Sequence, residues 1–175
     1  MNLVILLILA VLKIFQNSYP DIYQLRSWFE SSVENSNTAE KFYNELNKIP
    51  DAELSPLVLA YKGASICIMA KHTFSPFKKL AYLEEGLLKI NKAIKQNRNN
   101  AEIYYIRYCI ESSIPFFLGM SQHLENDINN IVTLLLKKRK WETIDIKIYK
   151  FLLNEDTVSD EQKTQLSNHY KTVYE

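Results

Sequence analysis

Residues 75–97 read SPFKKLAYLEEGLLKINKAIKQN and carry the clearest structural signal in the chain. Ser75 followed by Pro76 is a common helix start, because serine caps the first free N–H groups and proline is tolerated at the first helical position. Apolar residues then recur every three or four positions, so they share one helical face. This pattern predicts a helix over 76–97. The residues of its apolar face are Leu80, Leu83, Leu87, Ile90 and Ile94.

Comparable signals extend outward from this stretch in both directions. Ser55-Pro56 repeats the start signal, and Ser159-x-x-Gln162 has the spacing of a capping box. The connections between helices are short, as in proteins built from antiparallel helix pairs. We therefore predict an all-α fold, an irregular stack of antiparallel helix pairs closed by a C-terminal helix. The other predicted helices are 21–34, 38–49, 56–71, 100–112, 122–139, 143–153 and 160–173.

Two further apolar faces support these helices, and one segment is ambiguous. Residues 144–148 alternate between apolar and polar, which is a strand pattern, but a lone strand would have no partner. We therefore predict a helix there too. Asn37-x-x-Glu40 and Asn99-x-x-Glu102 resemble weaker capping boxes. The two apolar faces are Ile22, Leu25, Phe29 and Val33 in one helix, and Leu124, Ile128, Ile131 and Leu135 in the other.

Composition excludes several classes of protein. The chain has 175 residues, of which 47% are hydrophobic and 23% charged, so it is globular and of a size for one domain. With only 3 Gly and 5 Pro it lacks the residues for a turn-rich β-sandwich or a phosphate-binding loop. The formal net charge of +1 gives no electrostatic reason to expect a nucleic-acid partner. The basic run 137–140 is expected to be a solvated helix end, and the alternative is a contact with an anionic surface or nucleic acid.

The N-terminus begins with an unbroken apolar run from Leu3 to Leu12. This length fits the apolar region of a secretory signal and is short for a membrane span of about 20 residues. We predict a signal peptide over 1–18, a single helical domain over 19–175, and export to the periplasm or cell envelope. If the segment is not cleaved, it would anchor a structural protein to the membrane, and this would be the chain's membrane contact.

Export also bears on the two cysteines. In an oxidising compartment Cys67 and Cys109 could form a disulfide. Both lie inside apolar helical runs, however, and free cysteine is often a small buried apolar residue. We therefore favour two unpaired thiols and leave the disulfide open.

One junction resembles a tetratricopeptide repeat. Gly86-x-x-x-Ile90-x-x-Ala93 resembles the second helix of one repeat, and residues 98–102 (RNNAE) resemble the turn that follows it. Tyr104 then stands where the first helix of the next repeat usually carries an aromatic residue. Arg98 occupies the position of the family's proline. The resemblance covers about 25 residues, and the chain is also similar to exported helical proteins of the Bacteroidetes type.

The resemblance implies a mode of action. Proteins of this family line a concave face with their first helices, and this face usually binds a peptide or protein. The function it implies is a non-enzymatic interaction module for a protein or peptide partner. Tyrosine and arginine are frequent interface anchors. The residues implied to line the face are Tyr61, Lys62, Tyr104, Tyr105, Arg107 and Tyr108.

The segment 114–120 interrupts the helical pattern. Pro115 cannot continue a helix, and Gly119 is suited to a turn. We expect the three apolar residues between them, Phe116, Phe117 and Leu118, to fold over the core as a plug. The alternative is that they form an exposed patch that binds a partner.

Candidates for catalysis are few. His123 and Asp127 have the i, i+4 spacing of half a metal site, but no third ligand has a recognisable spacing. His72 follows Lys71 at a helix end, and the adjacent Glu84 and Glu85 point about 100° apart on a helix. We expect no cofactor and no metal. An enzyme or small-ligand binder with a site between helix pairs remains the alternative function, and clustering of these residues in one pocket would favour it.

Overall fold

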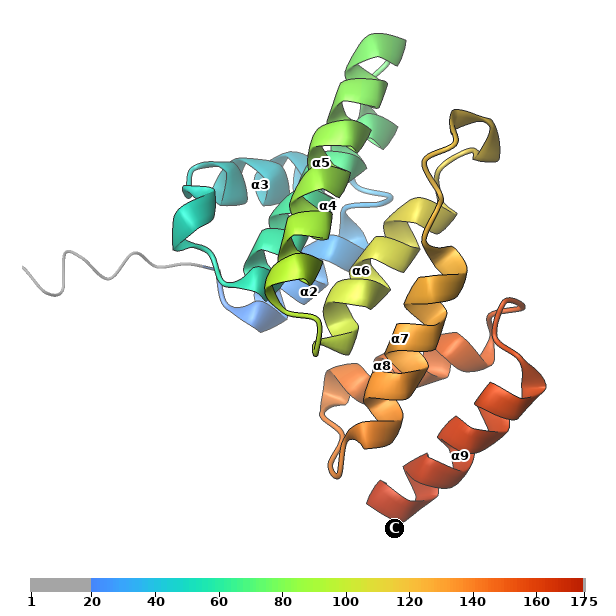
Figure 1. Ribbon diagram of the computed structural model, residues 1–175. Helices are drawn as coiled ribbons and strands as arrows, with labels where there is room; N and C mark the ends of the chain where they lie inside the picture. Colours follow the sequence, from blue (N-terminus) through green and yellow to red (C-terminus); the bar gives the residue numbers. More distant parts are fainter. Residues whose placement is uncertain (1–19, 175) are drawn as a thin grey trace, which may run out of the picture.

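The structure, a computed structural model, describes residues 20–174. The regular secondary structure in this range is helical, without a strand, as predicted (Figure 1). The long helices are α2 (Ile22–Ser31), α3 (Ser36–Asn47), α4 (Pro56–His72), α5 (Pro76–Gln96), α6 (Ala101–Ser112), α7 (Leu124–Lys137), α8 (Thr143–Leu153) and α9 (Asp160–Tyr174). Two short 3₁₀ turns, η1 (Asp51–Glu53) and η2 (Phe116–Leu118), lie in the connections. The predicted signal peptide lies outside the described residues.

The helix starts follow the predicted caps, with corrections at α3 and α6. Helix α6 is capped by Asn100 and not by Asn99, because the Asn100 side chain accepts from the backbone N–H of Glu102. The hydroxyls of Ser55 and Ser75 accept from the backbone N–H groups of Val58 and Lys78, and Ser159 and Gln162 form the expected capping box. Helix α3 begins two residues before the predicted start. The side chain of Asn35, not that of Asn37, caps it by accepting from the backbone N–H of Thr38. The alternating segment 144–148 is helical, as predicted, and lies in α8.

Helices α2, α4, α6 and α8 contact one another in succession, and α4 lies at the centre, in contact with α2, α3, α5 and α6. Two contacts in each pair show that α4/α5 and α6/α7 are antiparallel. Gly63 and Cys67 of α4 lie against Gly86 and Leu83 of α5. Arg107 and Glu111 of α6 lie against Asp127 and His123 at the start of α7. One apolar core extends from Leu25 in α2 to Leu166 in α9.

The closest helix contact joins α4 and α5. A Cβ atom on Gly63 would lie 2.5 Å from the carbonyl oxygen of Gly86, and a Cβ on Gly86 would lie 2.5 Å from that of Gly63. Both distances are shorter than real Cβ atoms show, so the two backbones meet at a point that only glycine fits. The small residue in the repeat-like motif therefore serves close packing between these helices.

Most of the predicted core positions are buried. Ile90, Ile128, Ile131 and Leu135 are among the most completely buried side chains. Leu124 is only half-buried, whereas Leu80 and Val33 are exposed, which corrects the predicted faces at their ends. Leu80 is exposed because the first turns of α5 extend beyond the neighbouring helices (Figure 1). Among residues 20–174, no helix combines the length and the apolar character needed to cross a membrane.

Candidate functional site

The six residues implied to line an exposed groove lie mostly inside the helix stack. Tyr105 is half-buried, and the other five are buried: Tyr61, Lys62, Tyr104, Arg107 and Tyr108. They belong to α4 and α6, and other helices cover both: α3 and α5 pack on α4, and α7 and α8 pack on α6. The structure therefore corrects the expectation of an open surface at these positions, because neighbouring helices occupy the face that the resemblance leaves free.

Tyr61 takes part in a buried charge cluster that joins α2, α4 and α6. Arg26 makes two hydrogen bonds to Glu102, from Nε to Oε1 and from Nη2 to Oε2, both 2.7 Å long. The Tyr61 hydroxyl donates to the same Oε1 at 2.6 Å. Burial raises the pKa of Tyr61 well above its ordinary value, so the hydroxyl keeps its proton and remains a donor. This carboxylate is thus satisfied within the protein.

Lys62 belongs to a second charge cluster, centred on Asp51 in η1. The Lys62 ammonium lies 2.8 Å from Asp51 Oδ1 and donates to the carbonyl oxygen of Ile49 at 2.6 Å. Lys89 of α5 lies 2.8 Å from the other carboxylate oxygen, Oδ2. Burial alone would raise the pKa of Asp51, but the two ammonium groups outweigh it and hold the pKa below its ordinary value. The cluster attaches the turn between α3 and α4 to both α4 and α5.

The lowered pKa of Asp51 predicts a pH-dependent contribution to stability. We expect Asp51→Asn to lower the free energy of unfolding at about pH 7 by about 1–3 kcal/mol, because it removes the counter-charge of the buried Lys62. A lowered pKa stabilises the fold above the ordinary Asp value of about 4, and this stabilisation is lost as the pH falls through the folded-state pKa. Urea unfolding of both proteins at neutral and acidic pH measures the effect. The difference should shrink in acid, and an unchanged difference would contradict the assignment.

The matched control for Asp51→Asn is Glu45→Gln. Glu45 pairs with Lys48 at 2.8 Å on the exposed side of α3. Exposed pairs of this kind contribute about 0–1 kcal/mol. We therefore expect the free energy of unfolding of this variant to differ from that of the unmodified protein by no more than about 1 kcal/mol.

Arg107 makes a third cluster, which joins α5, α6 and α7. Its Nε and Nη2 atoms donate to the two oxygens of Asp127 at 2.9 and 2.6 Å, and its Nη1 donates to Asn91 Oδ1 at 2.6 Å. Asp127 is fully buried. Burial raises the pKa of this carboxyl, and the Arg107 guanidinium opposes that rise. Arg107 is therefore fully used inside the protein and is not placed to bind an external ligand.

The tyrosines of α6 also contact other parts of the stack. The Tyr108 hydroxyl donates to Glu155 and lies 2.8 Å from the hydroxyl of Thr157, so it holds the connection between α8 and α9. The rings of Tyr105 and Phe151 meet edge to face, with centroids 5.1 Å apart. Tyr104 is buried in the core. These contacts explain why the aromatic residues of α6 pack within the protein.

The candidate catalytic and metal-binding residues do not converge. His123 lies 2.7 Å from Glu111, whereas Asp127 binds Arg107, so the i, i+4 pair does not share a site. His72 is within hydrogen-bond distance of the Ser32 carbonyl oxygen. Glu84 and Glu85 lie on the exposed side of α5. Within residues 20–174, no three His, Cys, Asp or Glu side chains are grouped to hold a metal ion.

Both cysteines are unpaired, as favoured from the sequence. Cys67 is buried and Cys109 is half-buried. Burial raises the pKa of each thiol to about 12, so both stay protonated at neutral pH. Because the thiolate is the reactive form, neither is activated as a nucleophile.

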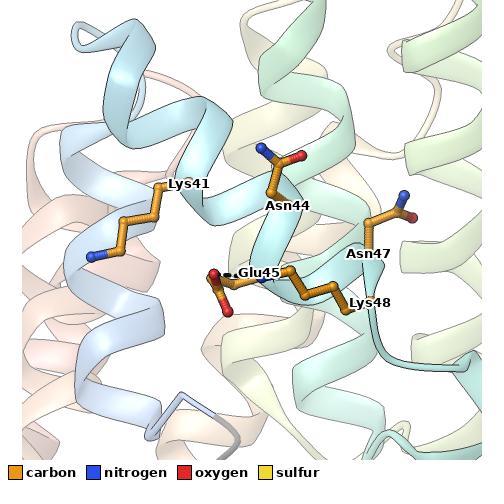
Figure 2. Close-up of a pocket in the computed structure, with 5 residues that line it drawn as sticks. All are labelled: Lys41, Asn44, Glu45, Asn47 and Lys48. Atoms are coloured by element: carbon orange, nitrogen blue, oxygen red, sulfur yellow. Dashed lines mark hydrogen bonds and ion pairs between the residues drawn. The ribbon is translucent and has the colours of Figure 1, made fainter.

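A shallow surface hollow lies on α3. Figure 2 shows its five lining residues, Lys41, Asn44, Glu45, Asn47 and Lys48. All belong to α3 or to the residue that follows it. Glu45 and Lys48 bind each other, and the side chains of the other three point in different directions (Figure 2). Ligand sites usually have polar groups that converge on one point inside a concave, largely apolar pocket. This hollow lacks that geometry.

The exposed apolar residues point to a different surface. Phe74 is 101% exposed, Phe77 86%, Phe116 91% and Phe117 84%. We call these four residues the aromatic end. The expectation that residues 116–118 plug the core is wrong, because η2 turns outward and Gly119 ends it with a φ of 63°, in the left-handed region. The alternative, an exposed patch, agrees with the structure.

Both parts of the aromatic end lie at the same end of the helix stack. Phe74 and Phe77 lie where α4 passes into α5, and Phe116 and Phe117 lie where α6 passes into α7. Since α5 and α6 are joined by a short connection at the opposite end, the start of α5 and the end of α6 lie on one side. Figure 1 shows the tip of the α4–α5 pair and the α6–α7 connection extending in the same direction.

Comparison of the chain with protein-family models, with curated proteins and with solved structures gave no match. The candidate site therefore depends on the geometry of the chain itself. Phe74 and Phe77 were not among the site residues predicted from the sequence. One signal in the sequence indicated the exposure of Phe74: it lies between a predicted helix end and the next cap, outside every predicted apolar face.

Proposed function

We propose that this chain is a non-enzymatic interaction module, exported to the cell envelope, that binds through its aromatic end. The observation that carries the proposal is the exposure of four phenylalanines at one end of the stack. A phenylalanine offers at least about 150 Å² of surface, so the four together offer roughly 600 Å². Monomeric proteins rarely expose this much apolar surface at one end of the molecule, and such surfaces usually mark an interaction site.

In this proposal the surface that contacts the partner is formed by the helix tips, and not by the concave face that the repeat resemblance implies. Arg107 and the tyrosines of α4 and α6 then stabilise the stack, and the tips make the contact. The apolar run at the N-terminus supports export. The partner is defined by its chemistry: it accepts phenylalanine side chains.

Photo-crosslinking in producing cells tests the proposal. A photoreactive benzoylphenylalanine is placed at position 77 or 117, and in a control at position 88. Leu88 is also an exposed apolar residue of α5, but it lies along the side of the stack. We expect light-dependent adducts at 77 and 117 that are several-fold more abundant than at 88. Equal labelling at all three positions would contradict the proposal.

A second variant checks that the tips are dispensable for folding. The change of all four phenylalanines of the aromatic end to serine should leave the helical content and the melting temperature nearly unchanged, because exposed side chains contribute little to stability. A photoreactive residue is also placed at position 118, because Leu118 is a half-exposed neighbour of these phenylalanines. The light-dependent adducts that it forms when the four phenylalanines are present should be lost in the serine variant. If the adducts persist, the phenylalanines are not the contact.

A further inference from the structure

The charge around the aromatic end is mainly basic. Residues 71–80 read KHTFSPFKKL and residues 112–124 read SSIPFFLGMSQHL, and neither segment contains Asp or Glu, although the chain has 20 acidic residues. Lys71 is paired with Glu34 at 2.6 Å. Lys78 and Lys79 are exposed beside Phe77, and neither makes an ion pair within residues 20–174. The surface next to the phenylalanines is therefore neutral to basic.

The shape of this end is convex. A side chain that lines a groove is partly covered by the opposite wall, whereas each of these four phenylalanines is more than four-fifths exposed. They lie on two separate turns, at the tip of the α4–α5 pair and in the α6–α7 connection (Figure 1). A protein partner would need a fitted pocket for each turn. A fluid bilayer surface accepts both without a fitted shape, because its headgroup region adapts to inserted apolar side chains.

We infer that the aromatic end docks on a lipid bilayer that carries anionic headgroups. Phe74, Phe77, Phe116 and Phe117 enter the boundary between headgroups and acyl chains, and the ammonium groups of Lys78 and Lys79 remain at the level of the lipid phosphates. This inference rests on the proposed function and names its partner. It adds a membrane contact on the folded stack, separate from any made by the N-terminal apolar run.

Position-specific fluorescence quenching tests this inference on the full chain. Residues 1–19 include an apolar run that could bind vesicles by itself, so sedimentation alone would not report on the tips. Phe77→Trp and Phe117→Trp each place an indole at the aromatic end, while the native Trp28 and Trp141 are buried. Leu88→Trp is the control, about 16 Å further along α5 from position 77. The vesicles are equimolar phosphatidylcholine and phosphatidylglycerol, with brominated acyl chains as the quencher.

The expected result is quenching that depends on position. Brominated vesicles should quench the emission of the indoles introduced at positions 77 and 117 at least twofold more than the emission of the control at position 88. Unbrominated vesicles should leave all three variants unquenched, because the bromine atoms are the quencher.

The lysines have their own test. In the Phe77→Trp protein, Lys78→Gln combined with Lys79→Gln should raise the concentration of mixed vesicles needed for half-maximal quenching about fivefold per lysine, because each lysine near an anionic surface contributes about 1 kcal/mol. Binding to vesicles of phosphatidylcholine alone should not change. Lys137→Gln with Lys140→Gln removes the same charge at the opposite end of α7, where Lys137 is the last helical residue, and should have no comparable effect. Equal losses in the two double variants would contradict the role of Lys78 and Lys79.

The outcomes separate this inference from the proposed function. Absence of quenching at 77 and 117, with or without vesicle binding, overturns bilayer docking. If crosslinking at 77 and 117 then yields protein adducts, the module binds a protein and the proposed function stands. If crosslinking also fails at both positions, the proposed function fails as well. Lipid adducts at 77 and 117 together with quenching support both.

Discussion

Replacement of Asp127 by alanine is expected to lower the free energy of unfolding by about 3–5 kcal/mol. Asp127 is fully buried and accepts two hydrogen bonds from Arg107, which is itself buried between α5, α6 and α7. The variant leaves the guanidinium without its counter-charge in a region that water does not reach. Of its hydrogen bonds, the Arg107 guanidinium would keep the one to Asn91. Chemical denaturation followed by circular dichroism measures the loss.

A double variant distinguishes the missing charge from the missing side chain. Arg107→Met with Asp127→Leu removes both charges and keeps apolar volume, and replacements of this kind are often neutral or stabilising. We therefore expect the double variant to be much more stable than Asp127→Ala. A loss below about 1 kcal/mol for Asp127→Ala would mean that the pair is solvated, contrary to the structure.

Gly86→Ala is the second substitution with a large expected effect. The new Cβ would lie 2.5 Å from the Gly63 carbonyl oxygen and 2.9 Å from the Cys67 backbone nitrogen, so α4 and α5 would have to separate. Alanine is favoured over glycine in a helix by about 1 kcal/mol, and the clash must exceed this gain. We expect a net loss of about 2 kcal/mol or more, since overpacking in a tight core costs up to about 3 kcal/mol and sometimes more.

Gly119→Ala provides the matched control. Gly119 has open space around its Cα but a φ of 63°, so its substitution introduces backbone strain without a clash. The expected loss is about 1–2 kcal/mol, from the left-handed conformation alone. Thermal melting of both variants compares the two costs. Stabilisation by Gly86→Ala would show that the helices do not meet at this point.

Local signals in the sequence predicted the helices well. Ser55 and Ser75 begin α4 and α5 as expected, because a capping hydroxyl and the following proline act within one helical turn. Two asparagines compete at the start of α3. The sequence favoured Asn37, but Asn35 adopts the extended backbone conformation that a cap needs. The ends of helices are ambiguous where several capping residues stand close together.

The placement of side chains across the stack was less predictable. The repeat resemblance implied an open face on the first helices, yet α4 is apolar on every side of the helix over residues 56–70, with Lys62 its one charged residue there. A helix without a polar face is expected to be buried, and this was the available signal for the correction. The partners of buried charges could not be read from the sequence, because Arg26 and Glu102 are 76 positions apart.

The hydrogen bonds between Arg26 and Glu102 affect how the protein opens. In repeat arrays each unit contacts mainly its neighbours, and terminal units can fray independently. Here, release of α2 alone would remove the guanidinium from Glu102, and that buried carboxylate would keep Tyr61 as its remaining side-chain donor. Local opening of the first helix therefore leaves a buried charge without its counter-charge, which costs about 3–5 kcal/mol in addition to the packing contacts that are lost. Backbone amide hydrogens of α2 and α6 should consequently exchange with solvent as one cooperative unit. This is expected although α3, α4 and α5 lie between the two helices along the chain.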